Sequence, residues 1–258
     1  MFITTAGRTN LVMINKAISI ATKLQIPYII RNKKSVTALQ TENKADCIVV
    51  GKTQLELFPR GEVAPFFFHP NSAMFRIKRL MNGEHDPFVE AAQLEDGMSA
   101  LDCTLGLASD SIIASFVVGT TGSVIGTEAN KYLAYLVKEG LMQWDSGVPE
   151  MNSAMQRIKV FNTNSFDFLK SLETNSFDVV YFDPMFEEPV IASDGIKALS
   201  RFAARDDLTE SLIEEALRVA KSRVVLKDHF RSDRFEKYRF KPIRRKSAKF
   251  HFGVIEKS

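Results

Sequence analysis

The sequence predicts an α/β protein with a doubly wound, seven-stranded, mostly parallel sheet, preceded by a small N-terminal α/β domain. Two observations carry this prediction. From Ala100 onward, apolar runs rich in β-forming residues alternate with helical runs, which is typical of parallel strands joined by crossover helices. The last two β-rich runs have no helix-length segment between them, which indicates a terminal antiparallel hairpin on the same sheet.

The expected elements of this sheet follow in order along the chain. The five parallel strands are Ser99–Cys103, Ser123–Thr127, Ile158–Phe161, Phe177–Phe182 and Arg223–Lys227. The helices are Ile112–Val118, Lys131–Lys138, Ser165–Leu172 and Thr209–Ala220, with Asp206 and Asp207 as N-cap candidates for the last. The hairpin strands are Lys237–Phe240 and Phe250–Ile255. Strand–helix units closed by a hairpin are the layout of the Rossmann-like class I methyltransferase sheet, whereas plain dinucleotide-binding folds lack the hairpin.

The first 68 residues are expected to form the small domain. Asn15–Lys23 has a helical pattern, and Ile26–Ile30 and Asp46–Gly51 have the composition of strands. Prolines and a glycine then interrupt the chain between positions 59 and 70. The predicted domains are therefore residues 1–68 and residues 69–258, and the second opens with a helical segment at Ser72–Leu80.

The composition is that of a globular protein with a sizeable core, because 45% of the residues are hydrophobic and 25% are charged. No apolar run approaches the roughly 20 residues that cross a bilayer. The first residues lack the basic-then-apolar layout of a secretion signal. Cys47 and Cys103 both lie in apolar stretches, so we expect reduced, buried thiols. A cytoplasmic location follows as an expectation, with no membrane partner.

Positive charge is concentrated near the end of the chain, although the formal net charge is only +3. The cations of this basic stretch, residues 218–249, are Arg218, Lys221, Arg223, Lys227, Arg231, Arg234, Lys237, Arg239, Lys241, Arg244, Arg245, Lys246 and Lys249. The acids in the same interval are Asp228, Asp233 and Glu236. Such an excess can attract a polyanion such as RNA. The alternative is a solvated surface that binds nothing.

The strongest local signal for a cofactor is the segment Leu101–Asp110. An apolar strand delivers Asp102, and a turn of small residues around Thr104 and Gly106 then opens a helix at Ser109 and Asp110. Small residues let the backbone approach a cofactor closely, and the helix N-terminus offers N–H donors. Ala108 in place of a glycine widens the turn slightly. A purely structural left-handed turn is the alternative.

Glu128, directly after the second predicted strand, strengthens the cofactor interpretation. An acid at this place can accept hydrogen bonds from both ribose hydroxyls of an adenosine cofactor. Its distance from Asp102 is 26 residues, longer than the roughly 20 expected, and a longer crossover near Gly119–Gly122 accounts for the excess. An exposed loop glutamate is the alternative.

The segment Asp183-Pro184-Met185-Phe186 follows a strongly apolar strand, at the sheet edge where ligands bind in open α/β folds. A methyltransferase acting on an exocyclic amine must localise a nitrogen lone pair that is delocalised into the ring. The Asp183 carboxylate and the Pro184 carbonyl can accept the two amine hydrogens, and Phe186 can stack on the base. A simple Asp-Pro turn is the alternative.

Other segments carry weaker signals or none. Asn164 and Ser165 follow the third strand, where they can hydrogen-bond adenine or simply cap a helix. The four histidines show no metal-ligand spacing, so no metal is expected. The sequence has neither a phosphate-binding P-loop nor a nucleophile-elbow motif. Phe66–Phe68 is expected in the core.

Together these motifs resemble the methyltransferases related to ribosomal small subunit methyltransferase J, in a subgroup of Gram-positive type. The resemblance runs from about Phe67 to Ile255. It is carried by Asp-x-Thr-x-Gly-Leu-x-x-Asp at 102–110, Glu128 with Asn130, Asp-Pro-Met-Phe at 183–186 and Arg-Val-Val-x-Lys at 223–227. It implies S-adenosylmethionine (SAM) as cofactor and guanine N2 of ribosomal RNA as the methylated group. The resemblance places Ser109, Asp110, Glu128, Ala129, Asn164, Ser165 and Asp183 in the cofactor pocket.

The sequence also departs from the ribosomal enzyme. Ala108 replaces a glycine of the turn, and Ser109 replaces an arginine. Asp228-His229-Phe230 follows Lys227 where a proline-rich segment is expected. We therefore predict SAM-dependent methylation of an exocyclic amine, with a base of ribosomal RNA as the first candidate. Methylation of a small-molecule or protein nitrogen and a non-catalytic SAM-binding RNA module remain alternatives. An NAD oxidoreductase needs a hydride-handling site that the motifs do not supply.

Overall fold

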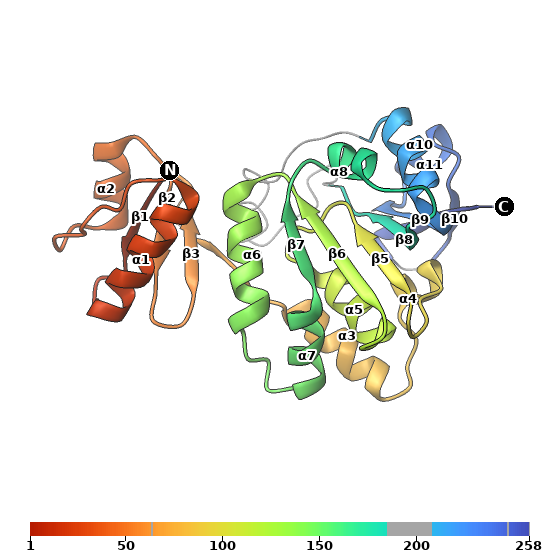
Figure 1. Cartoon of the computed structure of the whole chain (residues 1–258), viewed down its shortest axis with the longest axis horizontal. Coiled ribbons are helices and arrows are strands. Elements are labelled where there is room, and N and C mark those ends of the chain that lie inside the picture. The colour runs from red at the N-terminus through yellow and green to blue at the C-terminus, as the bar shows by residue number, and fades with distance from the viewer. Residues whose placement is uncertain (63, 185–207, 247, 258) are drawn as a thin grey trace. The chain divides into compact units, whose positions relative to one another are not determined.

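The computed structural model describes residues 1–62, 64–184, 208–246 and 248–257. In this part of the chain, two compact units follow one another, Met1–His69 and the residues from Pro70 onward. Each unit has its own sheet, one of four strands and one of seven (Figure 1). None of the described helices combines the length and the apolar character that a bilayer-spanning helix needs.

The first unit is a small α/β layer with strand order β1-β2-β3-β4. Its elements are β1 (Phe2–Thr5), α1 (Leu11–Leu24), α2 (Val36–Asn43), β2 (Cys47–Val50), β3 (Leu55–Phe58) and β4 (Phe66–Phe67). β1 and β2 pair in parallel and every residue in both is buried, while the β2–β3 and β3–β4 pairs are antiparallel. The strand predicted at Ile26–Ile30 is wrong, because this segment forms only a single bridge from Tyr28 to Ile3. Pro27 has no N–H to donate, which limits a longer ladder.

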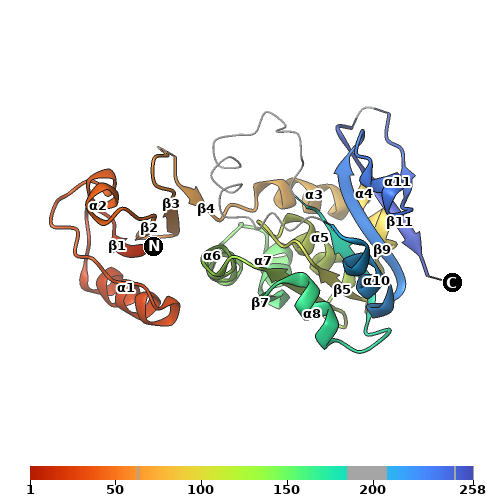
Figure 2. The ribbon, with the colours of Figure 1, turned by 90° about the horizontal axis from the view of Figure 1, so that it is seen from above.

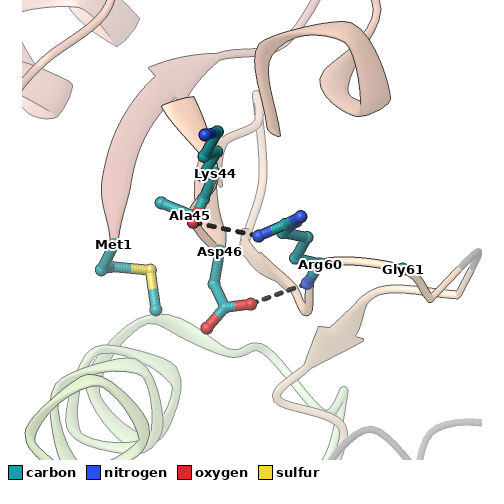
Figure 3. A pocket seen from close by; sticks show the side chains of 6 residues that line it. All are labelled: Met1, Lys44, Ala45, Asp46, Arg60 and Gly61. Atoms are coloured by element: carbon teal, nitrogen blue, oxygen red, sulfur yellow. Dashed lines mark hydrogen bonds between the residues drawn. The ribbon is translucent and has the colours of Figure 1, made fainter. Parts of the chain in front are cut away.

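A depression on the first unit is lined by Met1, Lys44, Ala45, Asp46, Arg60 and Gly61 (Figure 3). Its polar groups bind one another. The Arg60 amide donates to Asp46 Oδ1 at 2.7 Å, and the Arg60 guanidinium donates to the carbonyl of Lys44 at 3.4 Å. These bonds tie the start of β2 to the end of β3, so we assign the depression a structural origin.

The second unit contains the predicted seven-stranded sheet, with strand order β10-β11-β9-β8-β5-β6-β7. The strands are β5 (Ser99–Asp102), β6 (Ser123–Glu128), β7 (Lys159–Asn162), β8 (Phe177–Phe182), β9 (Ala220–His229), β10 (Lys241–Ile243) and β11 (Phe250–Glu256). The five strands from β5 to β9 run parallel, and β11 runs antiparallel to both β9 and β10. The predicted fold class is therefore confirmed, namely a class I methyltransferase sheet together with a small N-terminal α/β layer.

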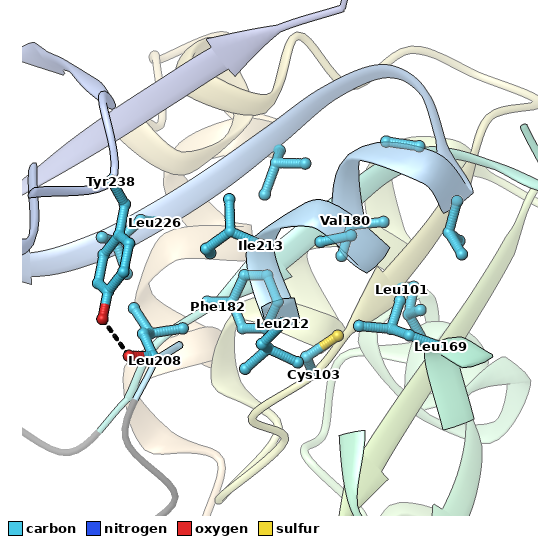
Figure 4. Packing of buried hydrophobic residues seen from close by; sticks show 14 of the residues in the cluster. Leu101, Cys103, Leu169, Val180, Phe182, Leu208, Leu212, Ile213, Leu226 and Tyr238 are labelled. Carbon is cyan, nitrogen blue, oxygen red and sulfur yellow. Dashed lines mark hydrogen bonds between the residues drawn. The ribbon is translucent and has the colours of Figure 1, made fainter. Parts of the chain in front are cut away.

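The helices of the second unit cover both faces of this sheet. They are α3 (Asn71–Met81), α4 (Pro87–Ala92), α5 (Ser109–Val118), α6 (Lys131–Gln143), α7 (Pro149–Arg157), α8 (Ser165–Ser171), α10 (Glu210–Val219) and α11 (Arg234–Lys237). α8 and α10 lie on one side of the central strands, with α4 and α5 on the other (Figure 2). The α8–α10 side holds a continuous core in which Leu101, Val180 and Phe182 meet Leu212 and Ile213 (Figure 4).

Two predicted details of the last third are wrong. The first hairpin strand is Lys241–Ile243 and not Lys237–Phe240, because Tyr238 and Phe240 turn into the core instead of pairing. The N-cap of α10 is Thr209, whose hydroxyl accepts from the amide of Leu212 at 3.2 Å. The N-cap candidates Asp206 and Asp207 lie outside the described residues.

Candidate active site

Polar residues gather where the parallel strands reach their carboxyl ends. Asp102 ends β5, Glu128 ends β6 and Asn162 ends β7, while Asp183 follows β8 directly. Neighbouring parallel strands deliver their carboxyl ends to one edge of a sheet, which is the ligand-binding edge of open α/β folds. The register places Asp102 opposite both Gly126 and Tyr181. The predicted loops of the site therefore start from one edge.

Strand alternation explains which side chains meet at this edge. Successive residues of a strand point to opposite faces, so Tyr181 faces away from the α8–α10 core to which Phe182 belongs. The Tyr181 ring packs against Phe88 of α4, with ring centroids 4.5 Å apart. Lys227 has the same parity as Val225, the partner of Tyr181 on β9. Tyr181 and Lys227 therefore share the face that α4 and α5 cover.

A chain of buried charges occupies that face. Arg76 of α3 donates to Asp110 Oδ1 at 2.5 Å and to both oxygens of Asp86 at 2.7 and 2.8 Å. Asp110 Oδ2 accepts from the Tyr181 hydroxyl at 2.8 Å and from Lys227 Nζ at 3.1 Å. Lys227 Nζ also contacts Asp183 Oδ2 at 2.7 Å. The predicted cofactor residue Asp110 and the predicted catalytic residue Asp183 are thus joined through one ammonium group.

The electrostatics of the two carboxylates differ. Burial raises the pKa of both, and Lys227 lowers it in both cases. At Asp110 the second cation, Arg76, tips the balance and holds the pKa below its usual range. At Asp183 burial and the negative charge of Asp110 prevail over Lys227, so the pKa is raised. Asp110 therefore acts as a fixed charge, whereas Asp183 is the acid of this pair that more readily takes up a proton.

The loop after β5 is organised by Asp102 and Thr104. Asp102 Oδ1 accepts from the Thr104 amide at 2.9 Å, and Oδ2 accepts from the Ser111 hydroxyl at 2.6 Å. Burial raises the pKa of Asp102 to about 7, although these two hydrogen bonds oppose the rise. The Thr104 hydroxyl accepts from the backbone amide of Asp183 at 2.6 Å. The cofactor loop and the Asp183 loop are thus directly bonded.

The turn itself uses two left-handed residues. Gly106 has φ +49° and Ala108 has φ +61°, a conformation that costs an alanine roughly 1–2 kcal/mol. Between them, the Leu105 side chain packs against Gly126 of β6, where a Cβ atom would collide with it. The Leu105 amide donates to the Thr127 carbonyl at 3.1 Å. The turn therefore sits directly against β6 despite the alanine.

Three of the helices that follow the parallel strands are capped differently. Asn130 caps α6 and Asn164 caps α8, each through a side-chain oxygen that accepts backbone N–H groups. The N-cap of α5 is Ala108, which has no such side chain, and the Ser109 hydroxyl bonds to Ser72 instead, at 2.8 Å. The first amides of α5 therefore have no side-chain cap, and an N-terminus of this kind favours an anionic group.

The predicted adenosine-binding residues form a second group at the ends of β6 and β7. Glu128 is buried, and its Oε1 accepts from the Asn130 amide at 2.9 Å. The Asn162 amide group donates to the carbonyls of Glu128 and Ala129 at 2.9 and 3.0 Å. Asn164 is the N-cap of α8 and Ser165 is its first residue, so the capping alternative is realised. The excess spacing between Asp102 and Glu128 is taken up by α5 and the Gly119–Gly122 loop.

Sequence patterns missed three members of the site, namely Arg76, Tyr181 and Lys227. Lys227 had a usable signal, because a lysine near the end of an apolar strand needs a buried partner. Arg76 and Tyr181 had none, since their partners come from distant segments. Of the predicted catalytic loop, Pro184 is buried, and Phe186 lies outside the described residues.

The sequence as a whole matches a known protein family. The family described as "Putative SAM-dependent methyltransferase" matches residues 31–251. This chain belongs to that family. The uncharacterized protein YpiP of Bacillus subtilis is 50% identical over 256 residues, covering 99% of both chains. The ribosomal RNA small subunit methyltransferase J of Nitrosococcus oceani is 28% identical over 188 residues, covering 70% of this chain and 72% of that protein.

A solved structure supports the fold. The SAM-dependent methyltransferase NGO1261 from Neisseria gonorrhoeae superposes with a TM-score of 0.64 at 16% identity, covering 99% of this chain and 96% of that chain. Membership of the SAM-dependent methyltransferase family confirms the predicted cofactor, S-adenosylmethionine. The residues fit such a group. A Cβ atom placed on Gly106 would lie 3.7 Å from the Thr104 carbonyl and within 4 Å of nothing else that the structure describes. The loop backbone is therefore open on that side.

Proposed function

We propose that this methyltransferase modifies an exocyclic amine of a nucleobase in ribosomal RNA, with guanine N2 as the first candidate. The observation that carries the proposal is the position of Asp183. Its carboxylate follows β8 at the ligand-binding edge, and its backbone amide is bonded to the cofactor loop through Thr104. The relatives named ribosomal RNA small subunit methyltransferase J support the choice of substrate class.

In this proposal the cofactor is held by the residues at the ends of β6 and β7 and by those of the loop between β5 and α5. Glu128 accepts the ribose hydroxyls, and Ala129, Asn164 and Ser165 surround the adenine. Asp102, Thr104, Gly106, Ser109 and Asp110 form the wall on the α5 side. When bound, S-adenosylmethionine supplies a methyl group attached to a cationic sulfonium. The uncapped amides of α5 suit its carboxylate.

Asp183 acts on the amine in this scheme. Lys227 binds Oδ2, and within the described part of the chain Oδ1 has no hydrogen-bond partner. We therefore assign Oδ1 to one amine hydrogen and the Pro184 carbonyl to the other. Holding both hydrogens aims the nitrogen lone pair and stabilises the positive charge that develops on nitrogen. The proton that nitrogen must lose can pass to Asp183, whose raised pKa suits that role.

In the basic stretch, only the exposed lysines and arginines support RNA as the partner. Arg231, Lys237, Arg239, Lys241, Arg244, Lys246 and Lys249 are exposed. Most of them belong to the segments around the β10–β11 hairpin, which pairs with β9 and so extends the sheet beyond Lys227. An exposed cationic surface beside the catalytic edge is what an RNA substrate requires.

The test is labelled-methyl transfer to RNA, DNA and protein pools, followed by substitution of Asp183. Asp183→Ala should lower single-turnover methylation roughly 100- to 1000-fold, the effect of losing one preorganised electrostatic group. Asp183→Asn keeps the shape of the side chain but not its charge. Its methylation rate should lie between those of the wild type and Asp183→Ala. Cofactor affinity should fall much less than the rate, and the melting temperature should fall less than in Lys227→Met, because Lys227 keeps its pair with Asp110.

Two outcomes would count against the proposal. Near wild-type turnover in Asp183→Ala would remove the amine mechanism, even with the cofactor assignment intact. Methyl transfer only to a protein or small-molecule pool would support methyltransferase activity but exclude RNA as the substrate.

A further inference from the structure

An exposed phenylalanine stands beside the catalytic edge. Phe230 follows the last residue of β9 and is 44% exposed, in contrast to the buried Phe235 and Phe240 of the same region. It belongs to Asp228-His229-Phe230, the segment in which the sequence departs from the ribosomal enzyme. A single exposed ring is common on protein surfaces, so the groups around Phe230 decide whether it marks a binding site.

The turn that carries Phe230 is rigidly built. Asp228 is buried, and its carboxylate accepts from the His229 amide at 2.7 Å, the Ser232 hydroxyl at 2.7 Å and the Arg234 guanidinium at 3.2 Å. The Phe230 amide donates to the Lys249 carbonyl at 3.1 Å, which ties the turn to the start of β11. The backbone that carries the ring is therefore fixed on both sides of Phe230.

Flat and cationic groups surround this ring. The His229 ring centroid lies 4.6 Å from that of Phe230, and the His251 centroid lies 6.1 Å away. The Arg231 guanidinium carbon is 5.0 Å from the centre of the Phe230 ring. Aromatic rings beside an arginine plane are the combination that stacks on nucleobases and neutralises nearby phosphates.

Phe250 connects this cluster to the catalytic edge. Its strand neighbour across the sheet is His229, and Lys227 Nζ lies 5.1 Å from the centre of its ring. The same Nζ is 2.7 Å from Asp183 Oδ2. The path from the proposed catalytic carboxylate to the Phe230 cluster therefore runs through one lysine and one ring.

We propose that Phe230, flanked by His229, Arg231 and His251, is a stacking site for an unpaired nucleobase of the RNA substrate, next to the base that is methylated. This inference rests on the proposed function, because it assumes a nucleic-acid substrate. A single-stranded segment fits better than a duplex, since only unpaired bases expose a face to an aromatic ring. The exposed Arg231 beside the ring favours a polyanion over an apolar partner.

Equilibrium binding to a fluorescein-labelled, single-stranded 12-nucleotide RNA tests the site. Phe230→Ala should weaken binding roughly 5- to 150-fold, the range for loss of one base–aromatic stack, and Phe230→Trp should retain it. The slope of affinity against salt should stay unchanged, because no charge is lost. Binding to a duplex of the same sequence should change less. Phe75→Ala, which removes a ring that is 65% exposed on α3, is the matched control and should bind as wild type.

The outcomes separate this inference from the function on which it rests. If Phe230→Ala binds the single-stranded RNA as tightly as the wild type does, the stacking site is wrong, and the proposal of an RNA substrate still stands. If the wild-type protein binds neither the single-stranded nor the duplex RNA, both the stacking site and the RNA substrate are wrong. Parallel loss of melting temperature and cofactor affinity in both Phe230 variants would show a structural role and also overturn the stacking site.

Discussion

Two groups of cations in the basic stretch differ in a way that the sequence does not reveal. Arg218, Lys221, Arg223, Lys227 and Arg234 bind acids or carbonyls of the fold, and the side chain of Arg234 is only 7% exposed. Lys241, Arg244, Lys246 and Lys249 are exposed and form no ion pair with any residue that the structure describes. The difference teaches that a count of positive charges overstates the binding surface, because the first group is already used to hold the strands and helices together.

Lys227→Met should have the largest effect on stability. It leaves Asp110 and Asp183 without their shared cation, and breaking a buried ion pair typically costs about 3–5 kcal/mol. Losing this positive charge raises the pKa of both carboxyl groups. Each group then resists ionisation, so the destabilisation should be greater at pH 8 than at pH 5. Urea unfolding at both pH values measures it, and the acid limb of methyl transfer should move to higher pH.

Lys221→Met is the matched control for that experiment. Lys221 pairs with Asp178 across an exposed surface, at 3.1 Å and with its side chain 44% exposed. Such pairs contribute about 0–1 kcal/mol. Equal losses in the two variants would mean that burial does not distinguish the two lysines.

Arg234→Leu should have a smaller but clear effect, at the lower end of the same range. The Asp228 carboxylate keeps two other donors, the His229 amide and the Ser232 hydroxyl, so we expect a loss of about 3 kcal/mol in unfolding free energy. Combining Arg234→Leu with Asp228→Asn should cost less than the sum of the single changes, since the pair is removed together. Additive losses would contradict a coupled pair.

Reversing the charge of Arg244 and Arg245 should have the smallest effect on stability, within about 1 kcal/mol, including the loss of the Arg245 contact with the Phe250 ring. RNA affinity should fall, and the slope of log affinity against log salt should decrease by about 2 if both arginines contact phosphates. Cofactor affinity should not change. RNA binding that stays the same at low and high salt would place both arginines outside the interface.

The sequence predicted the sheet well because its central strands contain runs of buried apolar residues. Phe177–Phe182 was located to the residue, since a run of buried residues between polar ends has few alternative structures. The hairpin strand was misplaced because Tyr238 and Phe240 look like strand residues yet pack inward from a turn, in which Arg239 has φ +61°. Periodicity identifies apolar residues, but it does not decide between pairing and packing.

The sequence predicted the acidic residues in the loops of the site but not the residues that bind them. Asp102, Glu128 and Asp183 could be placed because each follows an apolar strand at a known edge. Their partners could not. Arg76 and Asp110 are 34 residues apart, and Tyr181 reaches the same carboxylate across 71 residues, so no local pattern links them. Long-range ion pairs depend on how α3, α5 and β8 pack, which short motifs do not encode.

The place of β11 between β9 and β10 has a consequence for the order in which the protein is completed. β10 is synthesised before β11 but pairs with nothing else in the sheet, so Lys241–Ile243 must wait for Phe250–Glu256. Until those residues leave the ribosome, β9 presents an open edge of the kind that invites aggregation. The Lys249 carbonyl that anchors Phe230 arrives at the same time. In a nascent chain, the residues of β5 to β9 therefore precede the strand that covers the edge beside Lys227.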